Sequence, residues 1–165
     1  MIVSYYDSPI GTLELSFKDK KLCGLTITNV CSDNDSLANL PYIIKVKNWL
    51  NKYFKGEVVN IDEIPLLIEG TDFQKVVWRV LMDIPYGEVV SYKSIAEMVA
   101  SLMGRSSMSN QAIGTAVGKN KIAIIIPCHR VIGSNEKLGG YSLGIDKKIS
   151  LLELEGIDTS KLKNS

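Results

Sequence analysis

Apolar and polar residues alternate near the start of the chain. Between residues 12 and 17 every second residue is apolar, and this period of two is typical of a strand with one buried face. Turn-forming residues stand on both sides of the segment, at 8–11 and 18–21. We therefore expect residues 2–30 to form antiparallel strands.

The apolar spacing changes to three and four residues after Pro41, which suits the first turn of a helix. One face of this helix carries Ile43, Val46, Leu50, Tyr53 and Phe54. Gly56 is expected to end the helix. Residues 60–70, which contain Pro65 and Gly70, predict the connection to a second domain.

Two more helices are predicted near the ends of the second half. Apolar residues recur at helical spacing over 73–81, behind a cap at Thr71 or Asp72. The last helix is expected to run from a cap at Asp146 to Glu155. A carboxylate in a last turn faces the negative end of the helix dipole. Glu155 is therefore either an exposed side chain or one with a compensating partner.

A pair of short helices is predicted between these two. Ser91 is expected to cap a helix over 92–103, and Ser109 one over 110–119. In the first of the pair, the inward positions are Ile95, Val99 and Leu102. Two helices joined by a tight turn are typical of a helix-turn-helix, whose second helix commonly enters a DNA groove. The small residues of the second helix either ease packing or let a phosphate backbone approach closely.

The apolar run from Ile122 to Ile126 is too short for a helix and predicts a buried strand. Pro127 is expected to end this strand, because proline has no N–H for a sheet. Cys128 and His129 would then stand at a strand end, where a rigid backbone can present them to a ligand.

The adjacent Cys128 and His129 are candidates for chemistry, and His129 is the only histidine of the chain. A thiol reacts as its thiolate, which a free cysteine with a pKa of about 8.5 scarcely populates at neutral pH. A neighbouring imidazole is the usual remedy, so the pair indicates a nucleophile and its base. Taken alone, such a pair is more often a buried structural cysteine beside a histidine, and a cysteine hydrolase is a further alternative.

Composition excludes several classes of protein. The chain has 165 residues, 45% of them hydrophobic and 22% charged, which suits one large or two small globular domains. No apolar run approaches the ~20 residues of a membrane span and no signal peptide opens the chain, so we expect a cytoplasmic protein. Three cysteines without CxxC spacing and one histidine predict no metal site and no cofactor, with Cys23 and Cys31 reduced.

Charge is distributed unevenly between the two halves. Residues 1–70 carry 7 Lys/Arg against 9 Asp/Glu, a net charge of −2. Residues 71–165 carry 12 against 9, a net charge of +3. An anionic partner is therefore expected on the second half, although an imbalance of this size is also ordinary for a solvated surface.

Several motifs together carry a family resemblance. The most specific is Pro127-Cys128-His129-Arg130 after an isoleucine run. The others are Tyr6-Asp7-Ser8-Pro9-Ile10-Gly11, Thr71-Asp72-Phe73-Gln74 with Val77-Trp78, Ile84-Pro85-Tyr86-Gly87-Glu88-Val89-Val90-Ser91-Tyr92, Ala112-Ile113-Gly114, Gly118-Lys119-Asn120, Gly139-Gly140-Tyr141-Ser142 and Leu151-Leu152-Glu153-Leu154-Glu155-Gly156. This set resembles the O6-alkylguanine-DNA alkyltransferases, also called methylated-DNA–protein-cysteine methyltransferases.

The resemblance implies an α+β fold of two domains. Residues 1–68 would form a ribonuclease H-like scaffold of antiparallel sheet and helix. Residues 69–165 would form a mainly helical, winged-helix-like domain with the helix-turn-helix. The implied partner is double-stranded DNA that contains O6-alkylguanine, or more weakly O4-alkylthymine, and the protein is expected to be a monomer without metal or cofactor.

The implied reaction is a single, irreversible transfer of the alkyl group to Cys128 after the nucleotide is rotated out of the helix. A relay would run from Cys128 through a water to His129 and Glu155. Tyr92 would donate a proton toward guanine N3, and Asn120 would tie the helix-turn-helix to the Cys128 strand. The thioether product is inert, so each molecule would act once.

The resemblance also assigns binding residues. The guanine pocket would be formed by Pro127, Val131, Gly140, Tyr141, Ser142 and Lys148. DNA would be contacted by Ser91, Tyr92, Gln111, Ala112, Gly114, Thr115 and Arg130. Gln111 stands where the family usually has an arginine that fills the gap left by the flipped base, and a small insertion precedes Ser106.

Three other functions compete with this one. A cysteine hydrolase would use Cys128 and His129 over many turnovers. A non-catalytic DNA-lesion binder would have no need of the cysteine that this chain retains. A helix-turn-helix regulator would leave the Pro-Cys-His-Arg motif without a use.

Overall fold

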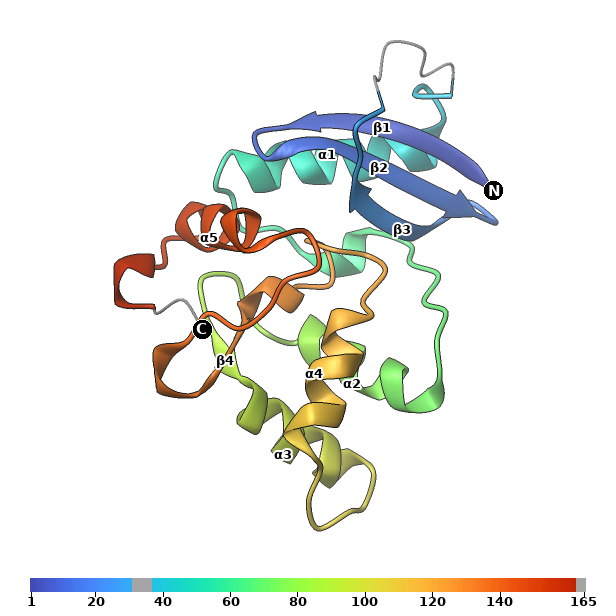
Figure 1. The fold of residues 1–165 in the computed structure, drawn as a ribbon. Coiled ribbons are helices and arrows are strands. Elements are labelled where there is room, and N and C mark those ends of the chain that lie inside the picture. The colour runs from blue at the N-terminus through green and yellow to red at the C-terminus, as the bar shows by residue number, and fades with distance from the viewer. Residues whose placement is uncertain (31–36, 163–165) are drawn as a thin grey trace. The chain divides into compact units, whose positions relative to one another are not determined.

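The computed structural model describes residues 1–30 and 37–162, which form two compact units (Figure 1). Unit 1 comprises Met1–Glu69 together with Lys121–Ala123, and unit 2 comprises Gly70–Asn120 and the chain from Ile124 onward. The division therefore differs from a single boundary near residue 68, because a short later segment belongs to unit 1. Cys31 lies outside the described residues.

Unit 1 is built on an antiparallel sheet of the order β1-β2-β3. Its strands are β1 (Ile2–Ser8), β2 (Gly11–Lys18) and β3 (Lys21–Ile27). The alternation in β2 buries Leu13, Leu15 and Phe17, as the sequence predicted. The two hairpin turns fall at the predicted places.

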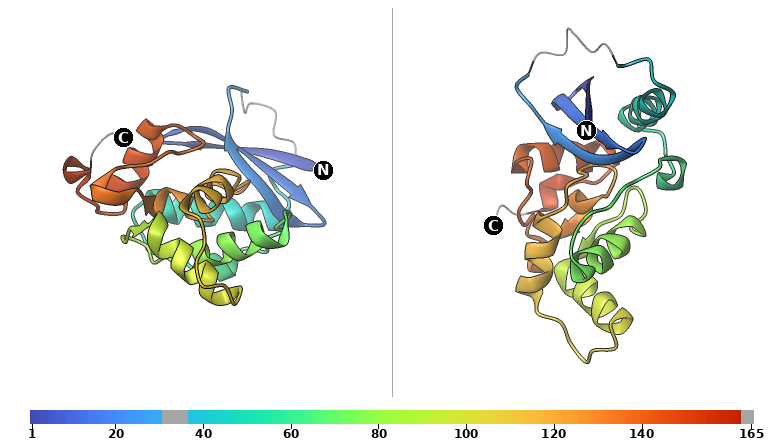
Figure 2. Two further views of the ribbon diagram at one scale, coloured as in Figure 1. Left: turned by 60° about the horizontal axis from the view of Figure 1, so that its bottom comes forward. Right: turned by 90° about the vertical axis from the view of Figure 1, so that its right-hand side faces the viewer.

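Helix α1 (Pro41–Phe54) packs on one face of this sheet, and the right-hand view of Figure 2 shows it nearly end-on beside the strands. Pro41 stands in its first turn and Gly56, at φ 84°, follows its end. Trp49 is buried, and its Nε1 donates to the Asn60 carbonyl at 2.9 Å, just before the short 3-10 helix η1 (Ile61–Glu63). The predicted helix is confirmed.

The predicted strand from Ile122 to Ile126 is wrong, although all five residues are buried. Only Ile122 pairs with β3: the Leu25 N–H donates to the Lys121 carbonyl at 2.9 Å, and the Ala123 N–H donates to the Leu25 carbonyl at 3.3 Å. Ile124 then has φ 71°, a left-handed conformation that lies outside the β region of backbone angles. The apolar composition reflects complete burial of a turn, which periodicity cannot distinguish from a short strand.

Unit 2 contains the helices α2 (Asp72–Met82), α3 (Tyr92–Leu102) and α4 (Asn110–Gly118). The hydroxyls of Thr71, Ser91 and Ser109 cap them as predicted, and Thr71 forms a capping box with Gln74. In α3 the prediction for Leu102 is wrong, since this side chain is 66% exposed where the helix ends. Trp78 of α2 is buried, and its Nε1 donates to the Ala116 carbonyl of α4 at 2.9 Å.

The remaining elements of unit 2 are short, apart from one helix. They are β4 (Val90–Ser91), β5 (Val131–Ile132), the 3-10 helices η2 (Cys128–Arg130), η3 (Ser134–Glu136) and η4 (Thr159–Lys161), and α5 (Ile145–Leu154). Strands β4 and β5 pair in parallel. Asp146 does not cap α5 as predicted, because Gly144 holds the N-cap position and Asp146 lies in the first turn.

The whole is an α+β fold, with a three-stranded antiparallel sheet in unit 1 and mainly helical structure in unit 2, as expected. Within residues 1–30 and 37–162, no helix combines the length and the apolar character needed to cross a membrane.

Candidate active site

Cys128 opens η2 directly after Pro127, where the chain turns rather than ending a strand. The residue is 4% exposed, and burial raises the pKa of its thiol. A hydrogen bond from Asn120 and the positive charge of Lys148 act in the opposite direction. At rest the sulfur is therefore a neutral thiol that needs a base before it can attack.

Asn120 follows the end of α4 and connects that helix to the Cys128 turn. Its Nδ2 donates to the Ile126 carbonyl at 2.9 Å and to Cys128 Sγ at 3.1 Å. The side chain is buried, so both hydrogen bonds lie away from water. The structure thus brings Asn120 and Cys128 together, as the resemblance implied.

His129 and Glu155 form a buried pair in which both side chains are fully inaccessible. His129 Nε2 lies 2.6 Å from Glu155 Oε2. Burial lowers the pKa of His129, and the charge of Arg130 acts in the same direction. Burial alone would raise the pKa of Glu155, but its bonds to His129 and Arg130 outweigh this and lower it to about 2. The stable arrangement is a neutral imidazole that donates from Nε2 to a carboxylate.

Arg130 was expected to contact DNA, but the structure places its side chain inside the protein. The side chain is 10% exposed, and its Nε donates to Glu155 Oε1 at 2.7 Å. Its Nη1 donates to the Ile84 carbonyl at 2.7 Å, and its guanidinium lies 5.8 Å from the centre of the Tyr86 ring. These contacts lie inside the protein, and they hold the guanidinium against Glu155 and the Ile84 carbonyl.

Lys148 of α5 is completely buried, and its ammonium binds backbone carbonyls. Nζ donates to Val131 at 2.6 Å, to Gly140 at 3.2 Å and to Leu138. Burial lowers the pKa of Lys148 to about 8. The side chain joins β5 to the 138–140 segment, which leads into Tyr141 and Ser142.

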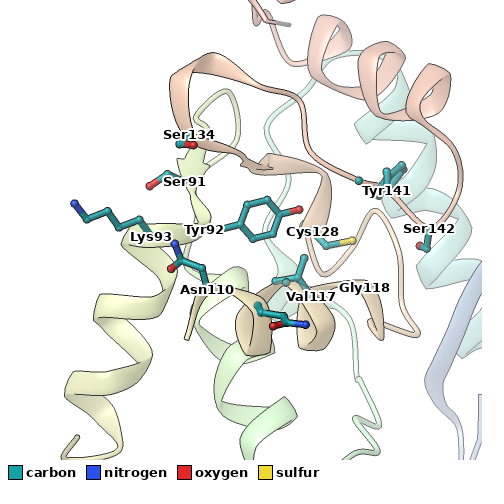
Figure 3. Close-up of a pocket in the computed structure, with 13 residues that line it drawn as sticks. Ser91, Tyr92, Lys93, Asn110, Val117, Gly118, Cys128, Ser134, Tyr141 and Ser142 are labelled. Carbon is teal, nitrogen blue, oxygen red and sulfur yellow. The ribbon is translucent and has the colours of Figure 1, made fainter. Parts of the chain in front are cut away.

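A cavity of about 710 Å³ opens beside Cys128, in the size range of ligand pockets. It is lined by Ser91, Tyr92, Lys93, Asn110, Gln111, Gly114, Val117, Gly118, Cys128, Ser134, Gly140, Tyr141 and Ser142. Figure 3 shows the Tyr92 ring reaching from the start of α3 toward Cys128, with Lys93 and Asn110 farther out. Cys128 is the only thiol among these residues.

The two tyrosines of the cavity are protonated at neutral pH. Burial raises the pKa of Tyr92, and the nearby Cys128 acts in the same direction. Burial also raises the pKa of Tyr141 well above its usual value. Among the described residues, the Tyr141 hydroxyl has no hydrogen-bond partner.

The structure separates the sequence-predicted binding residues into groups. Ser91, Tyr92, Gln111, Gly114, Gly140, Tyr141 and Ser142 line the cavity. Pro127, which precedes Cys128, and Val131 are both buried and do not line the cavity. Ala112 and Thr115 line a smaller hollow with the start of α2, and Gln111 borders both spaces.

Sequence reasoning missed four residues that line the cavity: Lys93, Asn110, Val117 and Ser134. Gly118, one of the small residues of the second predicted helix, also lines it. It also missed the Gly87 N–H, which donates to Glu155 Oε1 at 3.0 Å. Lys93 and Asn110 follow the predicted caps Ser91 and Ser109, so their place in a first helical turn was an available signal.

Within residues 1–30 and 37–162, no group of three or more His, Cys, Asp or Glu residues is arranged to hold a metal ion.

Comparisons with known proteins cover almost the whole chain. Residues 1–68 match the family described as "6-O-methylguanine DNA methyltransferase, ribonuclease-like domain", and residues 72–157 match "6-O-methylguanine DNA methyltransferase, DNA binding domain". A methylated-DNA–protein-cysteine methyltransferase of Methanosarcina barkeri is 42% identical over 158 residues, covering 92% of this chain and 96% of that protein. One of Mycobacterium tuberculosis is 41% identical, covering 90% and 88%.

Solved structures agree with the sequence comparison. The crystal structure of Mycobacterium tuberculosis OGT in complex with DNA superposes with a TM-score of 0.78 at 40% identity, covering 97% of this chain and 94% of that one. A methyltransferase from Methanococcus jannaschii superposes with a TM-score of 0.69 at 27% identity, covering 95% and 94%.

Fold and site first define a structural class: α+β proteins of two units in which a buried cysteine faces a cavity bordered by a helix pair. The matched regions then identify the family within that class. The chain belongs to the 6-O-methylguanine DNA methyltransferase family.

Proposed function

We propose that the protein repairs DNA by moving the alkyl group of O6-alkylguanine, and more weakly of O4-alkylthymine, to Cys128. The observation that carries this proposal is the position of Cys128: its sulfur lines the cavity and accepts a hydrogen bond from Asn120 at 3.1 Å. The relatives named methylated-DNA–protein-cysteine methyltransferase, and a relative solved in complex with DNA, support the same reaction and partner.

The cavity suits a base that has left the double helix. The O6 atom of a paired guanine lies inside the stack, so the nucleotide has to rotate outward before a protein group can reach it. Apolar walls from Val117 and the Tyr92 ring would receive the base, and the backbone around Gly140 and Ser142 would meet its polar edge. Lys148 would support this wall through its bonds to Leu138 and Gly140.

The transfer step begins with the thiol proton of Cys128. This proton passes through a water to His129 Nδ1, since Nε2 is engaged by Glu155. The thiolate attacks the alkyl carbon, a C–S bond forms, and the C–O6 bond breaks with its electron pair going to guanine. Tyr92, which is protonated at neutral pH, donates toward guanine N3 as the negative charge develops. In the overall balance, the thiol proton replaces the alkyl group on guanine.

Helix α4 is the element proposed to approach the DNA, with Gln111 at its exposed start and the small residues Ala112 and Gly114 behind it. Thr115 and Ser91 would contact the backbone. Small side chains allow close approach of a phosphate chain, and phosphate contacts set the register of the protein on the duplex.

Unit 1 is proposed to act as a scaffold, because all the described residues that line the cavity belong to unit 2. The proposal takes a single copy of the chain as the acting species, since Asn120, Cys128, His129 and Glu155 come from one chain.

The mass of the intact protein and of its peptides tests the proposal. After incubation with a duplex that contains one O6-methylguanine, the Cys128 peptide should gain one methyl group, and the Cys23 and Cys31 peptides none. Repaired lesions should level off at or below one per protein molecule. Turnover beyond one would favour a hydrolase, and tight lesion binding without a mass change would favour a non-catalytic binder. Either result refutes the proposal.

A further inference from the structure

Arg130 is the one charged residue of the Pro-Cys-His-Arg motif that points into the protein. Its guanidinium links Glu155 Oε1, at 2.7 Å, to the Ile84 carbonyl, also at 2.7 Å, and lies over the Tyr86 ring. The Tyr86 hydroxyl in turn donates to the Leu154 carbonyl, next to Glu155, at 3.2 Å. Arg130 therefore joins the end of α5 to the loop that leads into β4 and Tyr92.

These contacts give the two oxygens of the Glu155 carboxylate different partners. Oε1 accepts from Arg130 Nε and from the Gly87 N–H, at 2.7 and 3.0 Å, while Oε2 remains for His129 at 2.6 Å. Two donors on one oxygen fix the plane of the carboxylate and keep it ionised. The imidazole is thereby held with Nε2 as its donor nitrogen and Nδ1 as its acceptor.

Arg130 affects His129 through its positive charge as well as through its hydrogen bonds. Glu155 favours an imidazolium at His129, whereas burial and the cations of Arg130 and Lys148 disfavour it. Two further polar groups are the Cys128 thiol, next to His129 in sequence, and Tyr141, whose ring centre lies 6.4 Å from that of His129. A second permanent cation on the same carboxylate opposes protonation of the imidazole before the reaction starts.

We infer that Arg130 is a positioning residue of alkyl transfer: it holds Glu155 in place and, as a fixed cation, keeps His129 neutral so that the imidazole can accept the Cys128 proton. The inference rests on the proposed function and extends it by one residue. It also explains why this arginine faces inward, although an arginine next to a DNA-binding helix pair would ordinarily serve a phosphate.

The pH dependence of single-turnover transfer tests this role. An imidazolium cannot accept the thiol proton, so transfer in the wild type should fall only where His129 becomes protonated, below its ordinary range. In Arg130→Gln this fall of the rate at acidic pH, the acidic limb of the profile, should move to higher pH by on the order of one unit. Transfer at neutral pH should also fall about tenfold, because Glu155 is no longer held in place. Arg130→Lys, which keeps the cation but loses the bond to Ile84, should retain the wild-type limb at a reduced rate.

The single histidine of the chain provides a direct second readout. With ¹⁵N-labelled histidine, the ring nitrogen shifts report the tautomer and protonation of His129 without any DNA. We expect the Nε2-protonated neutral form in the wild type and in Arg130→Lys, and a raised titration midpoint in Arg130→Gln. This measurement does not depend on transfer, so an inactive wild type would refute the proposed function and leave the inference about Arg130 open to this measurement.

Arg79→Gln is the matched control, because Arg79 is an exposed arginine of α2. It should leave both the acidic limb and the His129 titration unchanged. The inference fails if Arg130→Gln lowers the rate equally at every pH while the His129 midpoint stays in place. If Arg130→Gln does not fold, Arg130→Lys decides alone: a changed tautomer or midpoint with the cation retained would overturn the role of the charge.

Discussion

Among single side chains, Cys128 and Asn120 form one chemical unit. The Asn120 amide donates to the sulfur at 3.1 Å and to the Ile126 carbonyl at 2.9 Å, and all three groups are buried. A hydrogen bond to a thiolate favours the charged form of the sulfur, which burial otherwise opposes. Asn120 therefore serves both the turn and the nucleophile.

Replacing Asn120 should separate these two roles. Asn120→Ala leaves the Ile126 carbonyl without its donor, and the free energy of unfolding should fall by about 1–3 kcal/mol. Asn120→Asp has nearly the same shape but places a negative charge beside the sulfur, so it should raise the pKa of Cys128 further and slow transfer more than Ala does. Urea unfolding and single-turnover transfer against pH measure the two effects. If both variants transferred the alkyl group at the wild-type rate, Asn120 would act only on the fold.

Some contacts of these side chains could be predicted from the sequence, and others could not. For Glu155 the helix-end position left two alternatives, an exposed side chain or one with a compensating partner. The family resemblance implied His129 as that partner, and the structure pairs the two side chains. Arg130 was assigned to DNA by the family resemblance, and the sequence does not show that its side chain is buried. Its partners, Ile84 and Glu155, are 46 and 25 residues away along the chain, so only the fold reveals them.

Among the secondary-structure elements, α4 has hollows along two of its sides. Gln111 borders the cavity of Cys128 and also the smaller hollow shared with α2. This residue is exposed at the start of the helix, and its side chain carries no charge. The family resemblance aligns this residue with an arginine that is usual in the family, and the next prediction tests that alignment.

Gln111→Arg adds a cation to the proposed DNA surface. Binding to duplex DNA at low salt should become tighter, and the salt dependence should steepen by up to about one phosphate-equivalent, because the cation displaces counterions. Val58→Arg, at a 77% exposed position of unit 1, adds the same charge outside the unit that contains α4 and should change neither quantity. Unchanged binding in Gln111→Arg would mean that residue 111 does not enter the DNA.

The turn before Cys128 contains a strained residue. Ile124 is 1% exposed and has φ 71°, a conformation that costs a residue with a side chain roughly 1–2 kcal/mol. Glycine has no such penalty, so Ile124→Gly should be more stable than Ile124→Ala by about 1 kcal/mol.

Ile126 is the matched control for this comparison, since it is equally buried at 1% exposure without a positive φ. There the order should be the ordinary one, with Ile126→Ala more stable than Ile126→Gly. The midpoints of urea unfolding of the four variants decide the matter. The same order at both positions would show that the turn relaxes when Ile124 is shortened.

Helices were easier to predict from this sequence than the Cys128 segment. The helix starts at Thr71, Ser91 and Ser109 could be predicted because capping is a local interaction between a side chain and the next turn. Ile122–Ile126 was misassigned because its structure depends on distant partners. Lys121 and Ala123 form hydrogen bonds with Leu25 of β3, whereas the chain from Ile124 onward belongs to unit 2. Local patterns contain no information about such a division.

For the molecule as a whole, the buried hydrogen-bond network of Glu155 makes the free energy of unfolding depend on pH in the acidic range. The pKa of Glu155 is lowered from 4.5 to about 2, so the unfolded chain takes up this proton before the folded one does. The stabilisation is present above the unfolded pKa and is lost as pH falls from about 4.5 toward 2. Its size is about 3 kcal/mol if the whole shift is realised.

Glu155→Gln should therefore lose less stability than the wild type between pH 4.5 and 2, although it should be less stable at neutral pH because Arg130 loses its counter-charge. Glu153→Gln changes an exposed carboxylate of the same helix and should follow the wild-type curve. The measurement is the free energy of unfolding by urea at several pH values. Parallel curves for wild type and Glu155→Gln would show that other carboxylates govern acid unfolding.

The two buried tryptophans give each unit its own optical reporter. Trp49 belongs to unit 1 and Trp78 to unit 2, and each indole N–H is bound to a carbonyl of its own unit, at Asn60 and Ala116. Because the Trp78 indole fastens α2 to α4, its fluorescence senses whether the helix beside the cavity keeps its place. Emission from a Trp49→Phe protein would thus record the loosening of α4 separately from the unfolding of the sheet, and would do so without a label.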